Sequence, residues 1–189
     1  MPRARGDGRG LPGRAAILSG ERGAGKTTLC LLLAEKLLGA GGIVCPAVFD
    51  RQGKKTGFRC LCLQSRVSWR LGTVSSAAAS AGLHTGKFTL SPTGVDKAIT
   101  CIHASLLARN GITVIDEIGP LELEQGSGFA AVLPLLEAAG DLLLVVRSRL
   151  VEEVLSYVRT HRTRVFHVTE ANRAALADEV AGFFDEQNE

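Results

Sequence analysis

No apolar stretch of this sequence approaches the length needed to cross a membrane, since runs such as Leu142–Val146 are only as long as a strand. Residues 1–14 lack the apolar segment of a signal peptide, and their glycines and prolines do not suit a transit peptide. We therefore expect a cytoplasmic protein with no membrane contact.

The spacings typical of metal sites are also missing. The five cysteines contain no C-x-x-C pair, and the four histidines contain no H-x-x-x-H pair. We expect the histidines to be structural or exposed. We expect the cysteines to be buried and reduced: Cys30, Cys45, Cys60, Cys62 and Cys101.

The composition is that of one globular domain with a short tail. The chain has 189 residues, of which 46% are hydrophobic, enough to bury a substantial core. Residues 1–14 hold four arginines and one aspartate among glycines and prolines, so we expect a disordered basic tail there. This tail is the one feature that points to a polyanionic partner such as RNA, and an RNA or a protein partner stays open at this stage. We expect a monomer whose single domain spans residues 15–189.

The first functional motif is a phosphate-binding loop. Residues 20–27 read G-x-x-x-x-G-K-T, between an apolar run at 15–18 and a stretch of helical period at 28–38. A strand before and a helix after give the context in which this pattern indicates a nucleotide site. Glycines allow positive φ, so the backbone N–H groups can form an anion nest at the positive end of the helix. The predicted nucleotide-binding residues are Gly20, Glu21, Arg22, Gly23, Ala24, Gly25, Lys26, Thr27 and Thr28.

A second motif complements this loop. The apolar strand predicted at 112–115 ends in two carboxylates, Asp116 and Glu117. An aspartate at such a strand end can hold Mg²⁺ opposite a loop threonine, so Thr27 and Asp116 are the predicted metal ligands. Glu117 is expected to leave the opposite side of the strand and to orient the water that attacks the γ-phosphate. Lys26, which can reach the β- and γ-phosphates, is the second predicted catalytic residue.

Arg147 is the third predicted catalytic residue. Arg147 and Arg149 follow the strand predicted at 142–146, where a guanidinium can stabilise charge on the transferring phosphoryl group. We prefer Arg147 for this role. The other interpretation, an exposed arginine at the start of a helix, stays open.

The element pattern predicts the fold class. Short apolar strands alternate with helices through the second half of the chain, which indicates a parallel sheet covered on both faces. Residues 43–63 predict an inserted β-hairpin, with a third strand at 67–74 and a helix at 95–109. We therefore expect an α/β P-loop NTPase, with a RecA-like, mostly parallel sheet. The other predicted elements are strands at 112–115, 142–146 and 165–168 and helices at 129–139, 151–158 and 171–184.

The sequence specifies the base only weakly. Residues 116–119 satisfy the D-x-x-G pattern of GTPases, but no N-K-x-D segment for reading guanine occurs in the chain. We therefore predict broad use of ATP, GTP, CTP and UTP.

With these motifs in place, the chain resembles a small family of broad-specificity nucleoside-triphosphatases of archaea and bacteria, which includes the animal cancer-related nucleoside-triphosphatase. That family carries D-E-I-G-P-[ML]-E, which residues 116–122 match. Residues 53–58 are similar to its G-x-[RK]-x-G-F, and residues 168–176 to its V-T-x-x-N-R-x-x-L. The resemblance covers residues 15–180 and implies Mg²⁺-dependent hydrolysis of nucleoside 5′-triphosphates to diphosphate and phosphate.

Two other function classes stay open at this stage. A small nucleoside or nucleotide kinase shares the size and the loop, and the five arginines at 147, 149, 159, 162 and 164 are compatible with a lid over the phosphates. A slow nucleotide-controlled switch protein is the other alternative.

Four further residues have open roles at this stage. Asn172 and Arg173 have two, capping the last helix or packing near the base. Glu122 has two as well, bonding to its own turn or reaching the site. For Trp69 we favour a partly buried strand position over stacking on a base.

Overall fold

The computed structural model describes residues 13–75, 83–108 and 111–186, so nearly all of the expected tail lies outside the described residues. The strands are β1 (Arg14–Ser19), β2 (Gly41–Val44), β3 (Ala47–Phe49), β4 (Lys55–Cys62), β5 (Ser68–Val74), β6 (Leu83–Thr85), β7 (Phe88–Leu90), β8 (Thr113–Ile118), β9 (Leu142–Val146) and β10 (Arg162–His167). The helices are α1 (Lys26–Lys36), α2 (Pro92–Ala108), α3 (Pro120–Leu123), α4 (Val151–Leu155) and α5 (Arg173–Asp185), with 3₁₀ helices η1 (Ala130–Ala138) and η2 (Ser148–Leu150).

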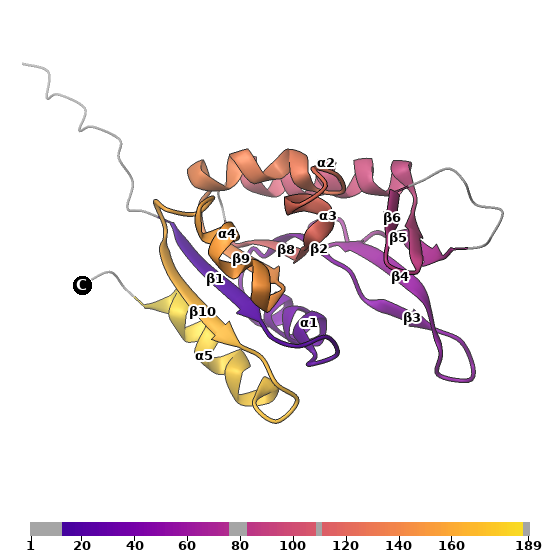
Figure 1. The fold of residues 1–189 in the computed structure, drawn as a ribbon. Helices are drawn as coiled ribbons and strands as arrows, with labels where there is room; N and C mark the ends of the chain where they lie inside the picture. The colour runs from indigo at the N-terminus through magenta and orange to yellow at the C-terminus, as the bar shows by residue number, and fades with distance from the viewer. Residues whose placement is uncertain (1–12, 76–82, 109–110, 187–189) are drawn as a thin grey trace, which may run out of the picture.

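One sheet runs through the molecule in the order β10-β1-β9-β8-β2-β4-β5-β7-β6, with β3 paired to β4 (Figure 1). The five strands from β10 to β2 are parallel to one another. The strands from β4 onward pair antiparallel. The predicted α/β class, with a mostly parallel central sheet, is confirmed. Because parallel strands end at the same edge, the residues that follow β1, β8, β9 and β10 meet there.

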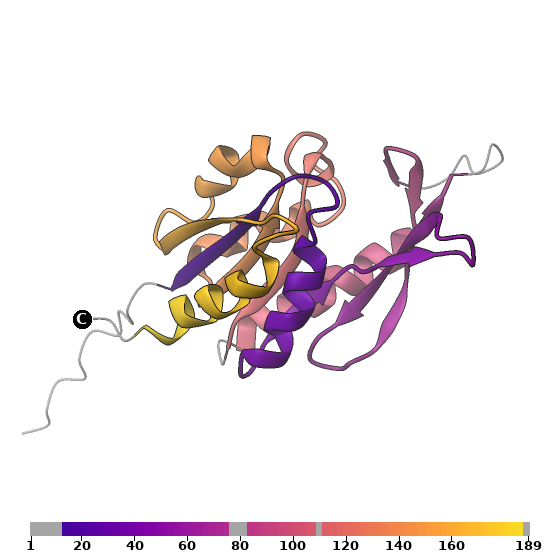
Figure 2. The same cartoon turned by 90° about the horizontal axis from the view of Figure 1, so that it is seen from below.

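The central strand β9 is apolar throughout because helices cover both faces of the sheet. In β9, Leu142, Leu144 and Val146 pack into the core beneath α2, whereas Leu143 and Val145 pack into the core beneath α1 and α5. Figure 1 shows α2 on one side of the sheet, and Figure 2 shows α1 and α5 side by side on the other. A strand whose side chains alternate between two buried faces is therefore a continuous apolar run in the sequence.

The predicted hairpin is present as β3 and β4, and β5 adds the third strand. Its turn is held by Asp50, whose Oδ1 accepts hydrogen bonds of 2.9 Å from the N–H groups of Gln52 and Lys54. The single strand expected from residue 43 to residue 49 is instead two strands, with Pro46 in the break. Proline has no N–H for a sheet ladder, which accounts for the interruption. Trp69 is partly buried, as favoured, and its Nε1 donates to the carbonyl of Gly94 at 2.9 Å.

Two predicted helices differ from expectation. The α-helix expected at 129–139 is the 3₁₀ helix η1, which contains Pro134. Pro134 has no N–H to donate and its ring clashes with the preceding turn of an α-helix, so it disfavours a regular α-helix here. The helix expected at 151–158 is shorter than predicted, since α4 spans only Val151–Leu155.

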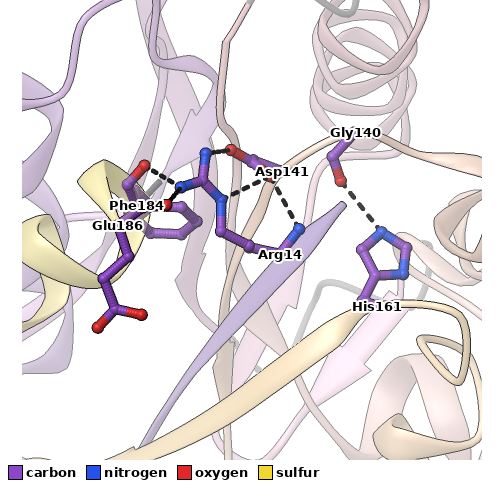
Figure 3. Close-up of polar contacts among 6 residues, drawn as sticks. All are labelled: Arg14, Gly140, Asp141, His161, Phe184 and Glu186. Carbon is purple, nitrogen blue, oxygen red and sulfur yellow. Dashed lines mark hydrogen bonds and ion pairs between the residues drawn. The ribbon is translucent and has the colours of Figure 1, made fainter. Parts of the chain in front are cut away.

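Arg14, which composition assigned to the tail, is instead the first residue of β1. Its guanidinium bonds to the carboxylate of Asp141 with an Nη2 to Oδ2 distance of 2.6 Å, and it donates to the carbonyls of Phe184 and Glu186 (Figure 3). Nearby, Nε2 of His161 donates to the carbonyl of Gly140 at 3.0 Å. These contacts join the start of β1, the loop before β9 and the end of α5.

The cysteine prediction is correct in part. All five thiols are free, but only Cys30, Cys60 and Cys62 are buried, whereas Cys45 and Cys101 are partly exposed. Within the described ranges, no group of three or more His, Cys, Asp or Glu side chains is arranged to hold a metal. No helix in these ranges is long and apolar enough to cross a membrane.

Candidate active site

The phosphate-binding loop connects β1 to α1 at the carboxyl edge of the sheet. Gly20, Gly23 and Gly25 all have positive φ, at 147°, 90° and 92°, as the motif predicted. A side chain at Gly20 would meet the carbonyl oxygen of Val168 at 2.3 Å, so the loop also packs closely against the chain after β10. Of the other predicted loop residues, Glu21, Arg22 and Thr28 are exposed, Ala24 is buried and Thr27 is partly buried.

Lys26 lies under this loop and is 8% exposed. Its ammonium donates to the carbonyls of Gly20 at 2.6 Å and Glu21 at 2.8 Å. Burial lowers the pKa of Lys26, and the carboxylates of Glu117 and Asp116 oppose that shift. A compact cation is thus held at the centre of the loop, facing the end of β8.

Asp116 is the buried carboxylate of the site, with 2% exposure. Its Oδ2 accepts a hydrogen bond of 3.1 Å from the N–H of Cys45, and its carboxylate also bonds to the hydroxyl of Thr27. Burial raises the pKa of Asp116 to about 6 in spite of these bonds and of the nearby Lys26. The two predicted metal ligands, Thr27 and Asp116, are therefore in direct contact.

Glu117 is more exposed than Asp116 and bonds to Arg147. Nε of Arg147 donates to Oε1 of Glu117 at 2.8 Å, so two predicted catalytic residues from β8 and the end of β9 are paired. Arg149 instead pairs with Glu124, after α3. The structure thus brings together five of the predicted site residues: Lys26, Thr27, Asp116, Glu117 and Arg147.

The predicted alternation of Asp116 and Glu117 on opposite sides of β8 falls at an irregularity in the strand. The pairing of β8 with β9 shifts register between Ile115 and Ile118, so the strict alternation of side chains stops before the two carboxylates. Both carboxylates act on the Lys26 ammonium. Glu117 and Asp116 therefore both lie within electrostatic reach of the loop lysine.

Glu122 bonds to its own turn and does not reach the loop. Its Oε2 accepts from the N–H of Gly119 at 2.9 Å, and its Oε1 accepts from the N–H of Phe129 at 3.2 Å. Burial raises the pKa of Glu122 to about 7. Glu122 therefore joins the two ends of the segment from Gly119 to Phe129, which follows the two carboxylates.

We predict that Glu122→Gln destabilises the protein by about 1–3 kcal/mol, because the new NH₂ group faces a buried N–H donor and leaves it without an acceptor. Urea unfolding at pH 8 measures this change. Glu124→Gln is the matched control: this carboxylate is exposed, and its replacement should barely move the unfolding midpoint. Equal midpoints for the two variants would contradict the role of Glu122.

Sequence reasoning missed Lys55, at the start of β4. Its ammonium lies 5.3 Å from the ring centroid of Phe58 and 5.4 Å from that of Phe88. Burial lowers the pKa of Lys55, Arg22 adds to that shift, and the two carboxylates of β8 oppose it. The inserted hairpin therefore brings the ammonium of Lys55 within electrostatic reach of Asp116 and Glu117. The basic position of the G-x-[RK]-x-G-F match was the available signal.

Most of the arginines from 147 to 164 in the described residues bond away from the phosphate-binding loop. Arg162 and Arg164 lie on β10 and pair with Glu186 and Glu179, at the end of α5 and within it. Among the arginines from 147 to 164 in the described residues, only Arg147 bonds to a predicted site residue.

Asn172 precedes α5 but makes no side-chain bond to the helix N-terminus. Instead its Oδ1 accepts from the N–H of Thr169 at 2.8 Å and its Nδ2 donates to the carbonyl of His167 at 2.8 Å. Asn172 thus has the structural role, but it holds the loop between β10 and α5 and does not cap the helix.

Several known proteins are similar to this chain over most of its length. Nucleoside-triphosphatase THEP1 of Methanopyrus kandleri is 29% identical over 170 residues, which span 87% of this chain and 91% of that protein. The THEP1 protein of Archaeoglobus fulgidus is 27% identical over 166 residues, which span 86% and 94%.

Two solved structures share the fold. The solution structure of a human cancer-related nucleoside triphosphatase aligns with a TM-score of 0.68 at 23% identity, over 93% of this chain and 100% of that chain. The crystal structure of THEP1 from Aquifex aeolicus aligns with a TM-score of 0.67 at 19% identity, over 91% and 99%.

A family model described as NTPase matches residues 15–181. The match starts in β1, includes the phosphate-binding loop and both carboxylates of β8, and ends within α5. Because it runs through nearly all of the described residues, the chain belongs to the NTPase family.

Proposed function

We propose that this protein hydrolyses ATP, GTP, CTP and UTP to the diphosphate and phosphate, in a reaction that depends on Mg²⁺. The observation that carries the proposal is the position of Glu117. This carboxylate is held by Arg147 and lies within electrostatic reach of the Lys26 ammonium. A general base needs such a position beside the γ-phosphate site.

The loop from Gly20 to Thr28 would bind the triphosphate through its backbone N–H groups at the start of α1. Lys26 would exchange its bonds to the carbonyls of Gly20 and Glu21 for bonds to the β- and γ-phosphates. Charge-assisted bonds to phosphate are stronger than the bonds to neutral carbonyls that they replace.

Thr27 and Asp116 fit a divalent cation. The two side chains are bonded to each other, and Asp116 is buried with its pKa raised, so a cation beside it would stabilise the ionised carboxylate. Mg²⁺ commonly takes one or two protein oxygens and completes its octahedron with phosphate oxygens and water. When bound, it would neutralise the charge that develops on the phosphates.

Glu117 would accept a proton from the attacking water, and Arg147 would keep the carboxylate turned toward it. Arg147 also lies where its guanidinium can approach the transferring phosphoryl group. The absence of an arginine lid within the described ranges favours hydrolysis over transfer to a bound acceptor. We also propose, from the composition of the sequence, that residues 15–189 form a single domain and that the protein is monomeric and cytoplasmic.

Phosphate release from ATP, GTP, CTP and UTP tests the function and its breadth. We expect all four to be hydrolysed without any acceptor, and we expect activity to vanish when EDTA removes the divalent cation and to return with Mg²⁺. Hydrolysis of one nucleotide only would contradict the breadth. Phosphate transfer to an added nucleoside or monophosphate, with little free phosphate, would favour a kinase.

A further inference from the structure

The order of the strands indicates the direction in which a bound nucleotide would extend along the edge of the sheet. The two carboxylates end β8, which lies on one side of β1 beyond β9, whereas β10 lies on the other side of β1 (Figure 1). If the γ-phosphate lies at Glu117, as in the proposed function on which this inference rests, the nucleoside extends from the loop toward the end of β10. The residues that meet the base are therefore sought in the segment between β10 and α5.

That segment is locked against the phosphate-binding loop. The N–H of Val168 donates to the carbonyl of Ser19 at 2.7 Å. Two hydrogen bonds join Thr169 and Asn172. The N–H of Asn172 donates to Oγ1 of Thr169 at 3.2 Å, and the N–H of Thr169 donates to Oδ1 of Asn172 at 2.8 Å. A side chain that follows this pair is held in a fixed place beside the loop.

Arg173 is that side chain. It is partly buried and lies over Gly25, where an added Cβ would meet Nη1 of Arg173 at 2.6 Å and its Cδ at 2.8 Å. Among the described residues, the side chain of Arg173 makes no hydrogen bond or ion pair, as is also the case for Arg22, Arg51, Arg66 and Arg70. Five other arginines each pair with a carboxylate: Arg14, Arg147, Arg149, Arg162 and Arg164. A planar guanidinium without a partner thus stands at the edge of the phosphate-binding loop.

We propose that Arg173 stacks its guanidinium on the nucleobase and so positions the nucleoside without reading its identity. Arginine stacks readily on aromatic faces, and every base offers such a face. Stacking does not distinguish purine edges from pyrimidine edges. Broad use of nucleotides then has a structural cause: the base is held by its face, and the binding specificity comes from the triphosphate.

Steady-state kinetics with Arg173→Ala, Arg173→Lys and the control Arg164→Ala tests this assignment. For Arg173→Ala we expect the KM for all four nucleotides to rise about 10-fold with little change in kcat, as for the loss of one base stack. The KM for ribose 5′-triphosphate, which has no base, should stay unchanged. Arg173→Lys should behave like Arg173→Ala because it keeps the charge and loses the plane. Arg164→Ala, on the edge strand and paired with Glu179, should match the wild type.

Two results would overturn the assignment. An equal rise in KM for ribose 5′-triphosphate, with rescue by Arg173→Lys, would mean that Arg173 contacts phosphate. Unchanged KM values for every substrate would mean that Arg173 touches no part of the nucleotide. Equilibrium titration with ADP and with ribose 5′-diphosphate makes the same comparison without turnover, so it separates a wrong stacking role from a wrong hydrolase assignment.

Discussion

Glu117→Gln should lower the rate of nucleotide hydrolysis by ~10²-fold or more, the usual size of a general-base effect. The substitution keeps the shape of the side chain and an oxygen that can accept the 2.8 Å bond from Arg147. It removes the ability to take a proton from water. Binding of ATP·Mg²⁺ should survive and tighten, because one negative charge beside the γ-phosphate is gone.

Single-turnover hydrolysis and a fluorescent-nucleotide titration separate these two effects. Asp116→Asn is the comparison variant, and it should weaken Mg²⁺ dependence and nucleotide binding together, because its proposed partner is the metal. If both variants lost binding to the same extent, both carboxylates would serve the metal. Hydrolysis by Glu117→Gln at the wild-type rate would remove Glu117 from the mechanism and return the kinase and switch alternatives.

Lys26→Ala should abolish tight nucleotide binding. Charge-assisted bonds are worth about 1.5–3 kcal/mol each. The loss of one to each of two phosphates therefore predicts an affinity lower by on the order of 10²-fold or more. Water cannot replace the ammonium, because the loop encloses it and only 8% of the residue is exposed.

Titration with a fluorescent triphosphate measures this loss, and Lys26→Met repeats it with a neutral side chain of similar length. Thermal unfolding of both variants shows whether losing the bonds to Gly20 and Glu21 disturbs the fold. Arg22→Ala is the control within the loop, since this exposed side chain should change affinity far less. Wild-type affinity in both Lys26 variants would rule out the site.

Features set by short stretches of sequence were predictable. The phosphate-binding loop could be recognised because three glycines and Lys26 fall within residues 20–26. The structure has the positive φ values that such a loop requires at these glycines. β9 was predicted with correct bounds because burial on both faces leaves five successive apolar residues. The contact of Thr27 with Asp116 followed from combining two such local motifs.

Features set by contacts between distant segments were not predictable. The register shift of β8 against β9 between Ile115 and Ile118 has no signal in the sequence, and neither does the electrostatic reach of both carboxylates to Lys26. Nothing near Arg173 in the sequence indicates that it lies on Gly25, because that contact depends on β10 pairing beside β1. Arg14 was assigned by its neighbours in sequence, whereas its partner Asp141 comes from the other half of the chain.

The contacts of Arg14 also decide where attachments to this domain would hang. Arg14 ties the start of β1 to the carbonyls of Phe184 and Glu186, so the two ends of the described domain leave the same edge of the sheet (Figure 3). The six residues of β1 separate that edge from the phosphate-binding loop by about 20 Å at the usual rise of a strand. A fused domain or affinity tag at either end would stay clear of the nucleotide. A short linker joining the ends, with new ends opened at the turn of Asp50, would give a circularly permuted protein with the candidate active site intact.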